Sequence, residues 1–371
     1  MKPHSFFVII FLVLFLYLPG VSGQPSGQGD TEREFLGVCI GFYNVENLFD
    51  TINDPAIRDD DFTPGGVNRW TSERYHEKLD NLARVISLMG KDFNDDGPAV
   101  LGLAEVENRR VLIDLASQES IRGRNYQVVH YAGPDARGVD VAFFYQPKYF
   151  TYFSSKAYPS VIDGQPGFRT RDQLLLTGEL LGERMHFIVA HWPSRRGGER
   201  RSRPLRIAMA DIARHIIDSI QAAEPGAKII FMGDLNDNPT DVSIRRHLRS
   251  KGSTDDVRDN ELYNPFENLF RRGIGSNAWR DSWSLFDQIL LTPGLLGRIL
   301  TVSVFTGLKC LTPHFCDNPP AGFRGIPSEL MEGVFTWGDI VIISRPWSTL
   351  SGKNKIIKPW HAVKEKTKEN P

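Results

Sequence analysis

The chain has 371 residues, of which 41% are hydrophobic and 24% charged, and its 44 Lys and Arg against 45 Asp and Glu give a net charge of −1. These values match an average soluble globular protein, so they exclude wholesale disorder, collagen-like repeats and a multi-span membrane protein. The near-neutral balance offers no whole-surface basic field for nucleic acid, but it leaves nucleic acid open as a ligand.

The first element in chain order is an apolar run from Phe6 to Leu18, with Lys2 before it and Pro19-Gly20 after it. Such a run is shorter than the roughly 20 residues that span a bilayer, and small residues follow it, as in a cleavable secretory signal. We therefore expect residues 1–23 to be a signal peptide and residues 24–33 a polar linker, with an uncleaved membrane anchor as the alternative. The sequence thus predicts an exported protein, periplasmic or extracellular.

The remaining chain alternates strand-sized apolar runs with helical patterns. The predicted strands are Leu36–Tyr43, Ala99–Glu105, Tyr126–His130, Val139–Tyr145, Gln173–Leu181, Met185–His191, Lys228–Gly233, Phe286–Leu291 and Ile299–Val304, and the predicted helices are Ser72–Leu88, Arg109–Gln118 and Arg203–Ala222. The connections within 126–145 and 173–191 are too short for a crossover helix, which favours antiparallel pairs in a mixed sheet. We expect one α/β domain over residues 34–345.

Polar and ionisable side chains stand at the ends of six of these strands. The segments are Phe42–Phe49, Leu101–Asn108, Arg137–Tyr145, Val189–Arg195, Ile230–Asp237 and Phe286–Leu291. Side chains at a strand end are held at the rim of the sheet, where ligands bind in α/β proteins. Carboxylates and amides there suit Mg²⁺, and a nearby histidine can move protons near neutral pH. Together they favour metal-assisted attack of water on a phosphoester.

Each of these residues also has an ordinary structural interpretation. Asn44 suits a turn, Glu105 a solvated carboxylate, and His191 a buried core histidine. The segment Gly233–Asn236 suits a turn with an Asx cap. The functional interpretation therefore depends on all six segments occurring in one order.

The six strand-end segments, taken in this order, resemble the endonuclease/exonuclease/phosphatase superfamily. This superfamily includes deoxyribonuclease I, abasic-site endonucleases, sphingomyelinases and inositol-polyphosphate 5-phosphatases. The resemblance covers about residues 35 to 328, and the strings Asn-Val-Glu-Asn, His-Trp-Pro-Ser-Arg and Gly-Asp-Leu-Asn-Asp look most like secreted bacterial members. It implies a four-layered α/β sandwich of two mixed sheets flanked by helices, with the site at one edge. It also implies a Mg²⁺ cofactor, with Mn²⁺ or Ca²⁺ as alternatives.

The resemblance gives roles to residues at the strand ends. Asn44 and Glu105 match the metal site, with Glu105 as the primary Mg²⁺ ligand. Asp234 matches the carboxylate that orients or deprotonates the attacking water, and Asn236 the amide that grips the scissile phosphate. His191 matches the first histidine of the family.

Four further residues have candidate roles beside these. Asp140 is the candidate that holds the tautomer of His191. Asp287 matches the aspartate that pairs with a second, C-terminal histidine. Arg171 and Arg195 are candidate phosphate clamps, with solvated surface arginines as the alternative.

The C-terminal part departs from the family pattern. The family has a last strand that opens with Ser-Asp-His, but this chain has no such triplet and reads Trp337–Arg345 where it is expected. The degenerate codons for this segment can also be read in a shifted frame, in which each triplet begins at the third base of a codon. In that frame they permit the sequence Gly-Gly-Tyr-Ser-Asp-His-Phe-Pro. Our hypothesis is that the reading frame slipped near Ser328, so that residues 329–371 are non-native, and the alternative is a divergent C-terminus.

Three functions are therefore considered. The first is an exported, Mg²⁺-dependent nuclease that hydrolyses DNA or RNA. The second is a phosphoesterase that acts on a phospholipid head group or a small phosphoester, which the aromatic-poor loop Asp50–Arg69 mildly disfavours in its lipid form. The third is a catalytically impaired binding protein that lacks the terminal histidine. We expect a monomer with no stable membrane partner.

Overall fold

A computed structural model describes residues 6–7, 10–16, 38–91, 94–162, 164–165, 167–279 and 282–306. The segment with Cys310, Cys316 and the suspected frame slip lies outside the described residues. Within them, Cys39 is a buried free cysteine. No helix in these ranges is long and apolar enough to cross a membrane.

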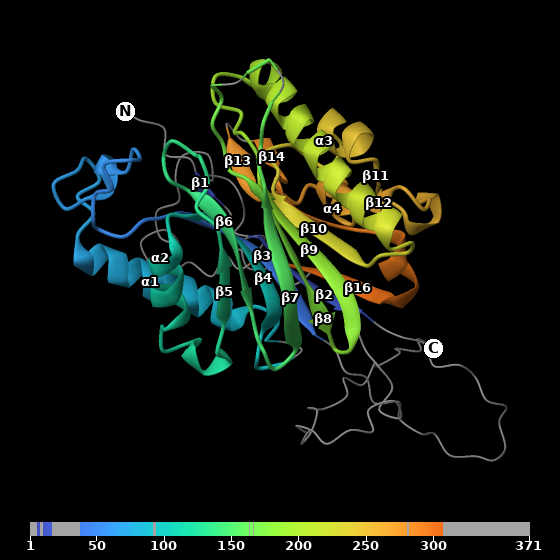
Figure 1. Ribbon diagram of the computed structural model, residues 1–371, viewed down its shortest axis with the longest axis horizontal. Coiled ribbons are helices and arrows are strands. Elements are labelled where there is room, and N and C mark those ends of the chain that lie inside the picture. Colours follow the sequence, from blue (N-terminus) through green and yellow to red (C-terminus); the bar gives the residue numbers. More distant parts are fainter. Residues whose placement is uncertain are drawn as a thin grey trace, which may run out of the picture.

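Two mixed β-sheets form the centre of the molecule (Figure 1). One has the strand order β11 (Ser250–Lys251), β12 (Leu262–Tyr263), β15 (Asp287–Leu291), β10 (Ile229–Asp234), β9 (Glu183–His191), β8 (Gln173–Leu180), β7 (Phe150–Tyr158). The other has the order β3 (Cys39–Leu48), β4 (Pro98–Val106), β6 (Asp140–Tyr145), β5 (Gln127–His130). We call them the seven-stranded and the four-stranded sheet.

Smaller strand groups and the helices complete the described chain. The strands are β1 (Phe6–Phe7) with β13 (Asn277–Trp279) and β14 (Ser282–Ser284), and β2 (Ile10–Leu16) with β16 (Ile299–Thr306). The α-helices are α1 (Ser72–Leu88), α2 (Arg109–Ala116), α3 (Glu199–Ala223) and α4 (Phe266–Arg271). Short 3₁₀ or π turns occur at Asp60–Phe62, Arg122–Arg124, Ser243–His247, Thr254–Asp256 and Pro293–Arg298.

Three apolar cores separate four layers. Between the sheets, Phe42 and Phe143 pack in one cluster with Val189 and Met232. Because side chains alternate along a strand, the neighbours of these residues face outward. Residues such as Tyr43, Leu103 and Phe144 form a second cluster with α1 and α2, and Ile188, Ala190 and Phe231 form a third with α3. The predicted four-layered α/β sandwich is therefore confirmed (Figure 1).

Local sequence explains the helices that cover the sheets. In α1 the buried residues Leu79, Leu82 and Ile86 recur at helical spacing and give one apolar face. In α2 the Asn108 side chain caps the helix by accepting hydrogen bonds from the backbone N–H groups of Arg110 and Val111.

The close approach of the sheets requires a glycine in β4. A Cβ at Gly102 would stand 2.6 Å from Met232 Sδ and 3.1 Å from Val189 Cγ2, both on the opposite sheet. The four-stranded sheet can therefore lie directly on the ends of β9 and β10 that carry polar residues.

Most sequence predictions of secondary structure agree with this arrangement. β5 and β8 pair antiparallel with β6 and β9, as expected from the short connections. α3 begins at Glu199 instead of Arg203 and continues through Pro204. The edge strand β7 was not predicted, because residues Thr151 to Ser154 are exposed and form no apolar run.

Candidate active site

Strand ends from both sheets meet at one edge of the sandwich. Asp234 at the end of β10 is in register with His191 on β9 and with Asp287 on β15. On the four-stranded sheet Asn44 is in register with Ala104, the residue before Glu105. Side chains that are far apart in the sequence therefore come together, as the sequence analysis expected.

Short contacts join the two sheets at this point. The Asn44 amide donates to Glu105 Oε1 at 3.3 Å and to Asp234 Oδ2 at 3.1 Å. His191 Nε2 lies 3.7 Å from each of the same two oxygen atoms. Glu105, His191 and Asp234 are all buried, so these polar groups form one enclosed cluster.

The backbone of the cluster is strained at positions without glycine. Glu46, Asn47, Glu105 and Asn236 have φ values of 53°, 55°, 63° and 50°, a conformation that costs about 1–2 kcal/mol for residues with a Cβ. Irregularities in strand pairing accompany it in β3 after Asn44 and in β4 at Glu105. Strain of this kind persists where surrounding contacts fix it, and it is typical of functional sites.

Side-chain acceptors hold these strained segments in place. The backbone N–H of Asn47 donates to Glu105 Oε2 at 2.9 Å, and that of Glu46 donates to Asn44 Oδ1 at 2.9 Å. On the other sheet the backbone N–H of Asn236 donates to Asp234 Oδ1 at 3.0 Å. Both carboxylates are therefore oriented by the backbone beside them.

Burial and neighbouring negative charge make Asp234 and Asp287 hard to ionise. Burial and then the charge of Glu105 raise the pKa of Asp234 from 3.8 to about 6, against the opposing hydrogen bonds from Asn236 and Asn44. Burial and then the charge of Asp234 raise the pKa of Asp287 well above its usual range. The cluster therefore has more negative charge than its protein neighbours neutralise.

The pKa of His191 is shifted in the opposite direction. Burial, followed by the positive charges of Arg171 and Arg137, lowers the pKa of His191 well below 6.5. The histidine is therefore neutral near pH 7. Its Nδ1 atom is buried and has no hydrogen-bond partner among the residues that the structure describes.

Two arginines border the cluster on the side of His191. Arg171 is buried, and it donates to Asp135 Oδ2 at 3.1 Å and to the Trp192 carbonyl oxygen at 2.7 Å. Its Nε atom has no partner in the described part of the chain. Arg137 lies 3.5 Å from the other oxygen of Asp135, and 48% of its side chain is exposed. Sequence reasoning gave Arg137 no role, although it lies two residues before the predicted strand Val139–Tyr145.

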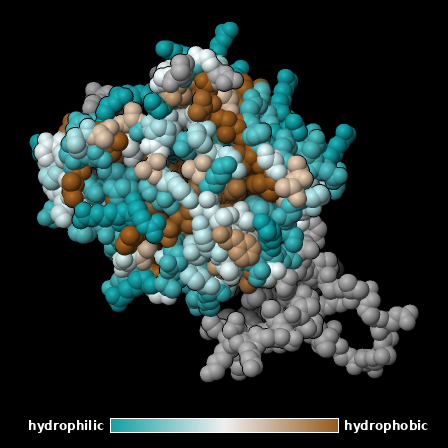
Figure 2. Space-filling model, viewed as in Figure 1, coloured by the Kyte–Doolittle hydropathy of each residue, from teal (hydrophilic) through white to brown (hydrophobic). Residues whose placement is uncertain are grey.

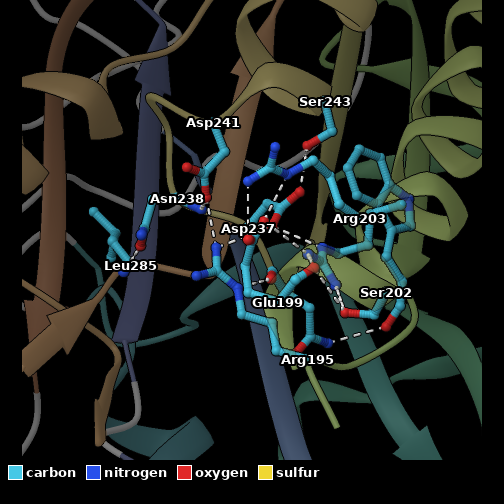
Figure 3. A network of polar contacts seen from close by, with 12 residues as sticks. Arg195, Glu199, Ser202, Arg203, Asp237, Asn238, Asp241, Ser243 and Leu285 are labelled. Carbon is cyan, nitrogen blue, oxygen red and sulfur yellow. Dashed lines mark hydrogen bonds and ion pairs between the residues drawn. The ribbon is translucent and has the colours of Figure 1, made fainter. Parts of the chain in front are cut away.

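Arg195, the second candidate clamp, is engaged within the protein (Figure 3). Its Nε atom donates to the Asn236 carbonyl oxygen at 2.8 Å, and one terminal nitrogen donates to Asp237 and Asp241 at 2.9 and 2.5 Å. The guanidinium also lies 4.8 Å from the centre of the Phe286 ring. These contacts direct Arg195 to the loop after β10.

The predicted contact of Asp140 with His191 is wrong. Both oxygens of Asp140 accept from the backbone N–H of Gly133, at 3.0 and 3.1 Å, and Asp140 Oδ2 lies 3.3 Å from His130 Nε2. Asp140 begins β6, which pairs with β4 and β5. This position directs its side chain to His130 on the neighbouring strand.

The cluster fits a divalent cation held largely by water. Among the residues with described positions, no three Asp, Glu, His or Cys side chains form a ready-made metal cage. Mg²⁺ usually binds through one or two carboxylates and keeps several waters, so the Glu105 carboxylate suffices as a first ligand. The Asn44 amide would add its oxygen after turning over, because its NH₂ group now faces the two carboxylates. The pKa values of Asp234 and Asp287 are raised, and Asp287 Oδ1 has no hydrogen-bond partner among the residues with described positions. Both observations indicate negative charge that a cation would neutralise.

Comparison with known proteins gives a family and several structural neighbours. The model of the Endonuclease/Exonuclease/phosphatase family matches residues 39–335. No curated protein matches the chain significantly.

Three of the similar solved structures come from two organisms. The human Nocturnin catalytic domain with bound sulfate has 17% identity and a TM-score of 0.45, over 74% of this chain and 90% of that one. A family protein from Bacteroides thetaiotaomicron has 14% identity and a TM-score of 0.46, over 70% and 84%. A mannosyl-6-phosphatase from the same organism has 15% identity and a TM-score of 0.41, over 59% and 77%. Such distant similarity assigns no substrate to this chain.

Proposed function

The chain belongs to the endonuclease/exonuclease/phosphatase family, and we propose that it is a Mg²⁺-dependent phosphodiesterase that hydrolyses DNA or RNA. One observation carries the proposal. The Asn44 amide bridges Glu105 and Asp234 across the two sheets, with His191 Nε2 within 3.7 Å of both carboxylates. Acidic, amide and imidazole groups that hydrolysis of a phosphoester needs thus converge on one point.

The proposed roles follow from position and charge. Glu105 and Asn44 would hold Mg²⁺, and bound Mg²⁺ supplies neutralisation of negative charge on the phosphorus oxygens. Asp234 accepts the proton of the attacking water, because its raised pKa makes it a stronger base than an ordinary carboxylate. Neutral His191 can donate a hydrogen bond from Nε2 to a phosphate oxygen without bringing a fixed charge.

Positive charge beside the cluster supports a phosphodiester substrate. Arg171 donates to the carbonyl of Trp192, next to His191, and its Nε atom has no partner within the described ranges, while Arg137 reaches solvent. Arginine binds phosphate in planar, two-point geometry. We propose that these two residues, in place of Arg195, receive the substrate phosphate.

The surface gives less support to a lipid substrate. Most of the face in Figure 2 is hydrophilic, with hydrophobic residues in several separate patches. In the loop between β3 and α1 the exposed large hydrophobic residues are Ile52 and Val67, and neither is aromatic. Membrane-inserting segments usually carry aromatic side chains, so we place nucleic acid before a phospholipid head group.

A plasmid-nicking assay tests the proposal directly. The full chain is incubated with supercoiled DNA or with RNA, in Mg²⁺ or in EDTA, beside the His191→Ala and His186→Ala variants. His186 is a matched control, since it is also buried on β9 but contacts Thr177 and Glu224. We expect EDTA-sensitive cleavage that His191→Ala abolishes and His186→Ala retains.

The same assay separates the alternatives. The chain as written is compared with a chain in which the shifted frame restores Ser-Asp-His. Cleavage by the restored chain alone would favour the frame-slip hypothesis, and binding without turnover by both would favour an impaired binding protein. Hydrolysis of a small phosphoester without any cleavage of DNA or RNA would replace the nuclease proposal.

Export and a monomeric state remain predictions from the sequence. Secretion would yield a mature N-terminus at Gln24, which N-terminal sequencing of the expressed protein can read. Light scattering at several protein concentrations measures the oligomeric state.

A further inference from the structure

We propose that Asp237, with Arg195 and Arg206, is a positioning residue that fixes the loop after β10 and thereby Asn236 and Asp234. The proposal deepens the proposed function and rests on it for the activity measurements. We call these three residues, with Asp241 and Ser243, the Asp237 network (Figure 3).

The centre of the network is a carboxylate between two guanidinium groups. Asp237 is 1% exposed, and its Oδ1 atom lies 2.9 Å from Arg195 and 2.7 Å from Arg206. Its Oδ2 atom accepts a hydrogen bond from the Ser243 hydroxyl at 2.6 Å. A buried carboxylate in such an environment is costly to disturb, because both arginines would lose an acidic partner. Arg195 would keep Asp241 at 2.5 Å, and Arg206 would keep the longer contact with Glu199 at 3.6 Å.

The network joins three segments that form the site on the seven-stranded sheet. Arg195 follows β9, Arg206 belongs to α3, and Asp237 follows β10. The Gln288 side chain on β15 adds a fourth, since it donates to the Asp237 carbonyl oxygen at 2.7 Å. The loop after β10 is therefore held from every strand that contributes His191, Asp234 or Asp287.

Asn236 is fixed at three of its polar groups. Its backbone N–H donates to Asp234, its side-chain amide donates to the Trp192 carbonyl at 3.0 Å, and its own carbonyl accepts from Arg195. It keeps a positive φ without being glycine, which requires contacts that over-determine the conformation. Arg195 supplies one such contact, and Asp237 orients Arg195.

Burial separates this network from an ordinary surface cluster. Arg206 is 0% exposed, and it also donates to Ser202 at 2.8 Å. Burial raises the pKa of Asp237, while Arg206, Ser243 and Arg195 lower it. Paired, buried charges of this type act as specific geometric constraints more than as sources of stability.

α3 provides a matched control. Arg214 is also buried on this helix, and its guanidinium lies 2.8 Å from Asp218. It also donates a hydrogen bond to the Gln221 side chain, on the same helix, at 2.9 Å. Arg206→Lys and Arg214→Lys thus make the same change at a buried arginine of α3. Asp218, the partner of Arg214, is 43% exposed, and only Arg206 contacts a loop of the site.

The experiment compares wild type, Asp237→Asn, Arg206→Lys and Arg214→Lys in the full chain. Hydrogen–deuterium exchange is measured for the peptide that contains Leu235 to Asn238, and kcat and KM for DNA cleavage are measured well below each melting temperature. Arg195→Lys, at a side chain that is 26% exposed, replaces any variant that fails to fold.

We expect Asp237→Asn and Arg206→Lys to speed exchange in this peptide and to lower kcat about 100-fold, since small misplacements of catalytic groups have effects of this size. KM should change less than kcat, and Arg214→Lys should change neither exchange nor kcat. Wild-type exchange and kcat in folded Asp237→Asn, or an equal loss of kcat in Arg214→Lys, would overturn the proposal. If the wild type cleaves no substrate, the proposed function fails, and the exchange comparison still decides whether Asp237 fixes the loop.

Discussion

The two sheets hold their halves of the candidate site by different means. On the four-stranded sheet, neutral backbone N–H groups of Glu46 and Asn47 orient Asn44 and Glu105. On the seven-stranded sheet, the Asp237 network adds buried ion pairs to the contacts around Asp234 and Asn236. The first half uses neutral backbone donors and the second adds buried ion pairs, so mutations should affect the two halves differently.

The largest effect is expected at the carboxylate shared by both halves. Asp234→Asn should lower kcat about 10³-fold, the usual range for loss of a general base. The melting temperature should stay equal or rise, because the variant removes a buried charge that Glu105 repels. Initial rates and thermal unfolding of the variant, with Asp218→Asn as control, check both parts. A loss of activity that only follows a loss of folded protein would contradict the assignment.

A pair of glycine substitutions compares the strained positions of the two halves. Asn236→Gly and Asn47→Gly both relieve a positive φ. Asn236→Gly should lower kcat about 10²-fold, because the amide is lost. Asn47→Gly should leave kcat within about threefold, since only its backbone N–H contacts Glu105. Equal kcat values for the two variants would contradict the different roles expected for the side chains of Asn236 and Asn47.

The pH dependence of the free energy of unfolding should reveal the raised pKa of Asp234. The pKa of Asp234 is higher in the folded chain than the ordinary 3.8. Its contribution to stability is therefore present below about pH 4 and is lost as the pH rises through about 6. The full shift of about 2 pH units corresponds to at most about 3 kcal/mol.

Thermal melts between pH 4 and 8 without divalent ions measure this effect. Relative to wild type, Asp234→Asn should lose less stability as the pH rises. The depressed pKa of His191 acts in the opposite direction, since the unfolded chain alone takes up its proton below about pH 6.5. The difference between the two proteins reports Asp234 together with its effect on the pKa of Asp287. An identical pH dependence would contradict the raised pKa of Asp234.

The smallest effect is expected at the exposed arginine beside the site. Arg137→Ala should raise KM about tenfold and leave kcat within about threefold, because a half-exposed side chain in the proposed role would contact the substrate in the ground and transition states alike. Steady-state kinetics with DNA, against Arg196→Ala at an exposed arginine after β9, checks this. A change in kcat alone would place Arg137 in the chemical step.

Sequence patterns predicted the framework well, because apolar runs and helical spacing report burial directly. The strand ends with Asn44, Glu105, His191 and Asp234 could be placed together, since polar residues there share one sheet edge. β7 escaped prediction because its outer residues are exposed, and an edge strand needs no continuous apolar run.

Other parts of the site depend on contacts that sequence does not encode locally. The partner of Asp140 follows from the pairing of β6 with β5, and sequence alone did not place His130 opposite it. Asp237 sits in a turn-like string, where an aspartate usually meets solvent. Its burial between Arg195 and Arg206 requires α3 to return over the sheet.

Cation binding to both halves tests the joined site most directly. Titration with Mn²⁺, read by the loss of the free-ion electron paramagnetic resonance signal, measures binding to wild type, Glu105→Gln and Asp234→Asn. We expect wild type to bind one ion, Glu105→Gln to lose binding, and Asp234→Asn to bind at least tenfold more weakly. No binding to wild type, or equal binding to all three proteins, would contradict a single metal-dependent site formed by the two sheets.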